Sequence, residues 1–314
     1  MNSHYKRPSI LFNGHIETIY PALLRKVRNV PDRTRQRIAT PDGDFLDLDW
    51  IKNNHNRLVI LQHGLEGSSD RAYILGMAKI FSNHRYDVCA WNFRGCSGEM
   101  NKTPLFYHSG ATYDLDLVVK EGLKNYDDIT LVGFSLGGNL TLKYLGEEKR
   151  DPRVKRGVAI SVPLDLATGA DNLDTPKCVL YQKRFLRNLR EKVISKESII
   201  PGSMNIKNLG KATSIRTFDE YFTAPIHGFD GADDYYRKNS SIFFLDGISV
   251  PTLILNASND PLLTPPTLNP QLASKFKFID YKITDQGGHV GFTEFNKEGY
   301  YWSEKKALNF CDSH

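Results

Sequence analysis

The chain has 314 residues, of which 40% are hydrophobic and 25% are charged, and its formal net charge is +5. This length suits one large domain or two small ones, and the composition is that of a globular protein. Because no run approaches the roughly 20 apolar residues of a membrane-spanning helix, and because the basic N-terminus lacks the apolar core of a signal peptide, we expect a cytoplasmic protein.

Strand and helix patterns alternate over the first half of the chain. A short helix is predicted at residues 20–27. A Pro-Asp-Gly turn at residues 41–43 joins two strands in a hairpin, at residues 35–40 and 45–51. Apolar runs typical of strands follow at residues 57–62, 88–93, 129–134 and 154–162. Helical periodicity between these runs is found at residues 71–83, 111–123 and 136–148.

This alternation breaks off after Pro163, and residues 163–245 are polar, basic and helix-like. One helix is predicted at residues 233–240, and another by apolar side chains at spacing four, namely Tyr181, Phe185, Leu189 and Val193. Strand patterns resume at residues 252–255 and 276–283, and the chain ends with a predicted helix at residues 300–311.

Alternating strands and helices predict an α/β fold, with a mostly parallel central sheet, helices on both faces and an antiparallel edge at the hairpin. The interruption is too long for a connecting loop. We therefore expect a single domain, residues 1–314, with a core of residues 1–162 and 246–314 and an inserted helical cap at residues 163–245.

A candidate nucleophile lies in the pattern G-x-S-x-G, formed by Gly133, Ser135 and Gly137 with their neighbours. An apolar strand precedes the serine and a helix follows it, which is the context that this motif requires. A sharp strand-to-helix turn leaves no room for side chains two positions away, so we expect the glycines to prevent collisions. The serine hydroxyl then stands at the carboxyl edge of the sheet, where such folds bind ligands.

Serine needs a base and an acid, which follow it along the chain in this type of fold. Asp260 comes directly after a strand, and His289 follows the next strand in the sequence GGHVGF. The preceding glycines let this loop approach the site closely. Asp285 is an alternative acid, whereas we expect His63 to pack and hydrogen-bond locally. The backbone N–H groups of Leu136 and Leu65 are the expected oxyanion hole.

Seven segments resemble the YheT-like branch of the α/β hydrolases, which includes eukaryotic ABHD-type (AB hydrolase 4) lipid hydrolases and yeast medium-chain ester synthases/esterases. The resemblance covers nearly the whole chain. The segments are NGHIETIYP, HGLEGSSD, NFRGCSGE, GFSLGGN, FTAPIHGFDGADDYY, NASNDP and GGHVGF.

This resemblance implies an α/β-hydrolase fold and a serine carboxylesterase with the triad Ser135, His289 and Asp260, acting on short- to medium-chain acyl esters without a cofactor or a metal. An acyltransferase that uses the same triad is the alternative. This chain lacks the His-x-x-x-x-Asp acyltransferase motif of some lipid-processing relatives, which weakens that alternative. A serine peptidase or a non-catalytic binding protein is a more distant alternative.

Positive charge is concentrated between Pro176 and Arg216, where ten Lys or Arg residues stand against two Glu residues. This excess has two interpretations. It is either a solvated helical face, or a surface through which the cap weakly contacts an anionic membrane or an anionic substrate. No nucleic-acid recognition motif accompanies the charge. The four cysteines form no CxxC pair, so we expect free thiols.

Overall fold

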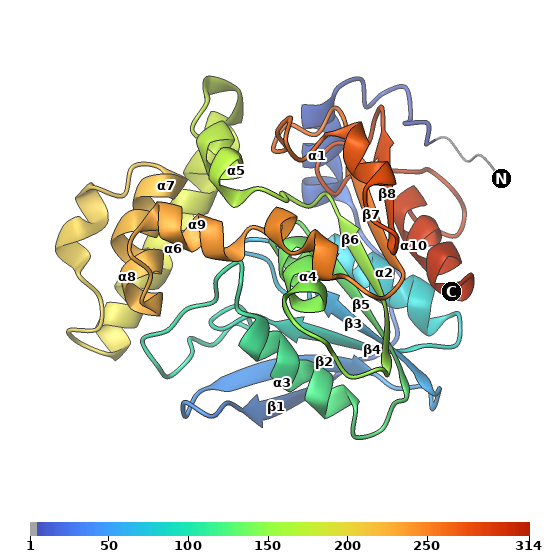
Figure 1. Ribbon diagram of the computed structural model, residues 1–314, viewed down its shortest axis with the longest axis horizontal. Helices are drawn as coiled ribbons and strands as arrows, with labels where there is room; N and C mark the ends of the chain where they lie inside the picture. The colour runs from blue at the N-terminus through green and yellow to red at the C-terminus, as the bar shows by residue number, and fades with distance from the viewer. Residues whose placement is uncertain (1–4) are drawn as a thin grey trace.

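A computed structural model describes residues 5–314 and contains one eight-stranded sheet with helices on both faces (Figure 1). The strands are β1 Thr34–Ala39, β2 Phe45–Ile51, β3 Arg57–Gln62, β4 Asp87–Asn92, β5 Asp128–Phe134, β6 Val154–Ile160, β7 Thr252–Ala257 and β8 Ile279–Thr284. Their order in the sheet is β1-β2-β4-β3-β5-β6-β7-β8. The pairs β1–β2 and β2–β4 are antiparallel and all the others are parallel, which confirms the predicted fold class.

The central strands are buried on both faces, which explains why their sequences are apolar without alternation. In β3, Leu58 and Ile60 join one apolar cluster while Val59 and Leu61 join another. The first cluster includes side chains of α3 Thr112–Gly122 and α4 Leu136–Glu147. The second includes side chains of α2 Ala72–Ser82 and α10 Trp302–Asp312, so each face of the sheet has its own helical layer.

Helix α1, Gly14–Leu24, begins six residues before the predicted start at residue 20, so that prediction was wrong about the boundary. The side chain of Asn13 caps the helix by accepting a hydrogen bond from the Ile16 N–H at 2.9 Å. The buried positions of α1 are Gly14, Glu17, Thr18 and Pro21, and these carry little apolar surface. The helix therefore lacks the apolar periodicity on which the prediction depended. Strand β8 likewise begins at Ile279 rather than at residue 276.

The chain between β6 and β7 forms helices only, as expected. These are α5 Leu166–Leu173, α6 Val179–Ile199, α7 Ile215–Phe218, α8 Ala224–His227 and α9 Ala232–Asn239, with short 3-10 turns and a π-helical turn at Asp219–Thr223. Figure 1 shows α6, α7 and α8 to one side of the sheet. A third apolar cluster holds this segment together, and Phe106 from the preceding part of the chain contributes to it.

Candidate active site

Ser135 stands at the junction of β5 and α4 in a strained backbone conformation, with φ 53° and ψ −118°. A Cβ atom on Gly137 would lie 2.5 Å from the carbonyl oxygen of His63, and one on Gly133 would overlap the carbonyl oxygen of Gly137. The motif predicted both collisions: a side chain at position 137 would meet the end of β3, and one at position 133 would meet α4. The tight turn thus depends on both glycines.

His289 lies between Ser135 and Asp260. Its Nε2 atom is 2.9 Å from Ser135 Oγ, and its Nδ1 atom is 2.8 Å from Asp260 Oδ2. Asp260 is 4% exposed, and its second oxygen accepts a hydrogen bond from the Leu262 N–H. The structure therefore brings together three residues that are 154 and 29 positions apart in sequence. The alternative acid, Asp285, is exposed and is not the carboxylate that contacts His289.

The loop after β3 passes directly beside Ser135, since a Cβ atom on Gly64 would lie 3.2 Å from Ser135 Cβ. Tyr73 Oη accepts a hydrogen bond from the Gly64 N–H at 3.0 Å and holds the start of this loop. Among residues 5–314, the N–H groups of Leu65 and Leu136 donate to no protein acceptor. Both groups are therefore available to a bound oxygen.

His63 supports the same loop. Its Nδ1 atom lies 2.8 Å from the carbonyl oxygen of Gly64, and its Nε2 atom accepts a hydrogen bond from the Phe93 N–H. Burial lowers the pKa of His63 to about 3, so the ring is neutral at pH 7, as these two contacts require. The local structural role predicted for His63 is confirmed.

Lys192 connects helix α6 to this loop, a role that its sequence context did not predict. Its Nζ atom lies 2.9 Å from Glu66 Oε1 and 3.0 Å from Cys96 Sγ. Glu66 Oε1 also accepts a hydrogen bond from Tyr107 Oη. Burial opposes the charge of Lys192, but Cys96 and Glu66 outweigh it and raise the pKa of this lysine. Glu66 has a φ of 54°, which is unusual for a residue other than glycine. The ion pair with Lys192 stabilises the loop in this conformation.

Helix α1 supports the loops that carry the acid and the base, and this role was also not predicted. Thr18 Oγ1 accepts a hydrogen bond from the His289 N–H at 2.8 Å. The fully buried Glu17 carboxylate accepts hydrogen bonds from the side chain of Asn259, next to Asp260, and from the Gly287 N–H. The segment NGHIET, at residues 13–18, therefore stabilises the loops of Asp260 and His289 from a distant part of the chain.

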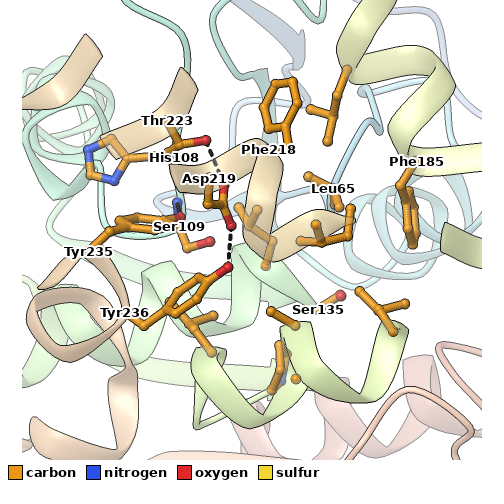
Figure 2. Close-up of a pocket in the computed structure, with 18 of the residues that line it drawn as sticks. Leu65, His108, Ser109, Ser135, Phe185, Phe218, Asp219, Thr223, Tyr235 and Tyr236 are labelled. Atoms are coloured by element: carbon orange, nitrogen blue, oxygen red, sulfur yellow. Dashed lines mark hydrogen bonds between the residues drawn. The ribbon is translucent and has the colours of Figure 1, made fainter. Parts of the chain in front are cut away.

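Two cavities meet at Ser135 and His289. The first has a volume of about 130 Å³, and the second of about 420 Å³. Ser135, His289, Leu65, Phe185 and Leu262 line both of them. Figure 2 shows the first cavity, whose apolar walls include side chains of the helical segment between β6 and β7. Its apolar lining residues include Leu166, Ala170, Leu173, Leu189, Ile215 and Phe218.

The second cavity opens beside α1 and is more polar at its rim, where Arg71 and Arg184 contribute. The exposed side chains of Leu23 and Leu180 lie on the same rim. No helix among residues 5–314 combines the length and the apolar character needed to cross a bilayer. In the same residues, no group of three or more His, Cys, Asp or Glu side chains is arranged to hold a metal ion.

This chain is similar to known proteins over most of its length. A family model described as "alpha/beta hydrolase fold" matches residues 57–295. The Escherichia coli K12 protein named "Putative esterase YheT" is 35% identical over 89% of this chain and 84% of its own length. A monoacylglycerol lipase of Saccharomyces cerevisiae is 28% identical over 94% of this chain and 67% of its own. The phospholipase ABHD3 of Mus musculus is 30% identical over 82% of this chain and 66% of its own.

Solved structures share the fold at lower sequence identity. The esterase Pf2001 of Pyrococcus furiosus has a TM-score of 0.59 and 20% identity, with 92% of this chain and 96% of that chain covered. A bacterial membrane phospholipase A has a TM-score of 0.56 and 18% identity, with 97% of this chain and 94% of that chain covered. At such identities the likeness concerns the fold alone.

Proposed function

Because this chain belongs to the α/β-hydrolase family, in its YheT/ABHD branch, and is an esterase-type hydrolase, we propose that it cleaves short- to medium-chain acyl esters through a Ser135–His289–Asp260 triad and an acyl-enzyme. The observation that carries this proposal is the continuous contact from Asp260 Oδ2 through His289 to Ser135 Oγ, at 2.8 and 2.9 Å. These are the distances over which a base can remove the serine proton.

In the first half of the reaction, Ser135 Oγ attacks the ester carbonyl carbon while His289 Nε2 accepts the hydroxyl proton. Asp260 fixes the tautomer with the proton on Nδ1 and stabilises the imidazolium. The N–H groups of Leu65 and Leu136 bind the oxyanion, and one such donor is worth about 3 kcal/mol in the barrier. His289 then protonates the leaving alcohol as its bond to the acyl carbon breaks.

In the second half, water attacks the acyl-enzyme by the same route. His289 takes a proton from the water, and Ser135 leaves with that proton as the acid is released. We assign the acyl chain to the first cavity, because apolar side chains dominate its walls. We assign the alcohol to the second cavity, because Glu66, Arg71 and Arg184 contribute charged groups to its wall. Residues 163–245 act in this proposal as a cap that covers the acyl chain and limits its length.

The triad is tested with p-nitrophenyl esters from acetyl to palmitoyl. Ser135→Ala should lower kcat by at least about 10⁴-fold, because the nucleophile is removed while substrate binding remains. Ser198→Ala is the matched control, since Ser198 is exposed and lies away from both cavities. Wild-type turnover in Ser135→Ala would refute the assignment. An optimum at short or medium chains supports the proposed substrate range, and a palmitoyl optimum contradicts it.

We further propose weak peripheral contact with anionic membranes at the mouth of the second cavity. Leu23 is 68% and Leu180 70% exposed there, next to Arg184. Exposed leucines beside cations suit an anionic lipid surface. A larger fraction of the protein should sediment with phosphatidylserine-containing vesicles than with phosphatidylcholine vesicles. Leu180→Ser should reduce the fraction that sediments with phosphatidylserine. Equal sedimentation with both lipids would contradict the proposal.

A further inference from the structure

The first cavity changes character along its length. Figure 2 shows Ser135, Leu65 and Phe185 on one side of it, with Asp219, Thr223, His108, Tyr235 and Tyr236 gathered on the other. An apolar chain that entered from Ser135 would thus end against polar groups. A purely hydrocarbon chain cannot form hydrogen bonds with these polar side chains. The arrangement therefore suits a ligand that carries its own polar group.

Two groups at this polar end have unused hydrogen-bonding capacity, and Asp219 is the first. Its two carboxylate oxygens accept hydrogen bonds from Thr223 Oγ1 at 2.6 Å and Tyr236 Oη at 2.7 Å. In the described chain no Lys or Arg nitrogen lies within 4.0 Å of this carboxylate. Each oxygen keeps a free lone pair. Burial raises the pKa of Asp219 to about 6, so the carboxylate is mostly charged at pH 7.

His227 is the second group. Within residues 5–314 its Nε2 atom is buried and has no hydrogen-bond partner. The ring stands 4.5 Å from the ring of His108, and both line the cavity. Burial lowers the pKa of His227 to about 4 and lowers that of His108 as well, so both rings are neutral at pH 7. A buried nitrogen without a partner is rare unless a ligand or water satisfies it.

We propose that the polar end of this cavity binds a hydroxyl group on the distal part of the acyl chain, and that the enzyme prefers such hydroxyacyl esters over unsubstituted esters of equal length. This inference rests on the proposed ester hydrolysis. A hydroxyl can donate to the Asp219 carboxylate and exchange a second hydrogen bond with His227 Nε2. An unsubstituted chain would place methylene groups against the remaining lone pairs of Asp219 and would leave His227 Nε2 without a partner.

Other polar groups fit less well. Asp219 would repel a terminal carboxylate by like charge. A terminal ammonium would exchange its hydration for a single carboxylate in a mainly apolar cavity that Lys192 also lines, and the cost of removing water from the charge opposes that exchange. A hydroxyl is neutral and both donates and accepts, which suits a cavity lined by an anionic acceptor and a neutral imidazole.

The experiment compares p-nitrophenyl decanoate with a series of hydroxydecanoates that carry the hydroxyl at successive positions along the chain, and with the ω-carboxyl ester. For at least one hydroxyl position, kcat/KM should exceed that of decanoate by about tenfold, the size of one good hydrogen bond to a charged group. The ω-carboxyl ester should be the poorest substrate. The ratio of kcat/KM for the preferred hydroxydecanoate to that for decanoate should fall toward one in His227→Phe and in Asp219→Leu. Asp219→Asn should retain part of this preference.

Each ratio is measured on one protein preparation, so it does not depend on the folded fraction of a variant. Asp127→Asn, at an exposed position away from the cavity, is the control and should keep the wild-type ratio. The inference is overturned if no hydroxyl position raises kcat/KM, or if His227→Phe and Asp219→Leu both keep the preference. Failure of the proposed function has a different result, since then neither decanoate nor any hydroxydecanoate is cleaved.

Discussion

At the scale of single residues, side chains remote in sequence hold the three aligned residues in place. Thr18 contacts His289 across 271 positions of the chain. Lys192 contacts Glu66 across 126 positions. The candidate acid, base and nucleophile could be predicted from the sequence because each carries a local motif after a strand. Thr18, Glu17 and Lys192 carry no comparable signal, since their roles arise only when distant segments meet.

Thr18→Val tests this support. Valine keeps the shape but removes the oxygen that accepts the His289 N–H, which leaves a half-buried donor without its partner at a penalty of about 1 kcal/mol. We expect kcat on medium-chain esters to fall roughly tenfold with little change in KM, because the imidazole is misplaced while the cavities are intact. Thr213→Val is the control, as Thr213 is exposed. An unchanged kcat in Thr18→Val would show that the contact has no positioning role.

At the scale of elements, the turn from β5 into α4 depends on how closely the helix approaches the end of β3. Apolar runs and glycines predicted this strand, turn and helix, because the constraints there are local. The start of α1 could not be predicted in the same way. Its buried face consists of Gly14, Glu17, Thr18 and Pro21, and it packs on loops that come some 240 residues later in the chain, such as that of Asn259.

Gly137→Ala should disrupt the turn. The added methyl group would stand 2.5 Å from the carbonyl oxygen of His63 and 2.6 Å from that of Gln62, and these backbone atoms cannot turn aside as a flexible side chain could. We expect a loss of about 3 kcal/mol or more in the free energy of unfolding. Gly210→Ala provides a matched comparison, because nothing lies within 4 Å of a Cβ atom there. Chemical denaturation of both variants measures the difference, and equal stabilities would contradict this account of the turn.

At the scale of the whole molecule, the sheet order separates chain neighbours and joins distant strands. Strand β4 lies between β2 and β3, so β3 sits beside β5, and this inserts the loop after β3 next to Ser135. A mostly parallel sheet with an antiparallel edge could be predicted from the alternation of elements. The order of the strands could not, since burial on both faces makes the central strands alike in sequence.

Buried neutral histidines make the stability of the molecule depend on pH. The pKa of His63 is about 3 in the folded chain, below its ordinary value of 6.5. The unfolded chain therefore binds the extra proton first, and the stabilisation present above pH 6.5 is lost as the pH falls toward 3. Between pH 7 and pH 5 this group alone should remove about 2 kcal/mol from the free energy of unfolding.

Urea denaturation of wild type and His63→Gln at both pH values isolates this effect. The variant is expected to be less stable at pH 7, because it loses the histidine contacts with Gly64 and Phe93. Its decrease in stability from pH 7 to pH 5 should nonetheless be about 2 kcal/mol smaller than that of wild type. The other titrating groups are common to both proteins and cancel in the comparison. Identical pH dependence would mean that His63 titrates normally in the folded state.

Covalent labelling with a fluorophosphonate, followed by peptide mass spectrometry, tests the central claim that Ser135 is activated by His289 and Asp260. We predict a single adduct, on the peptide that contains Ser135, in wild type. The rate of labelling should fall by at least about 10³-fold in His289→Ala, because the serine loses its base. An adduct on a different serine, or labelling that is equally fast without His289, would contradict the account.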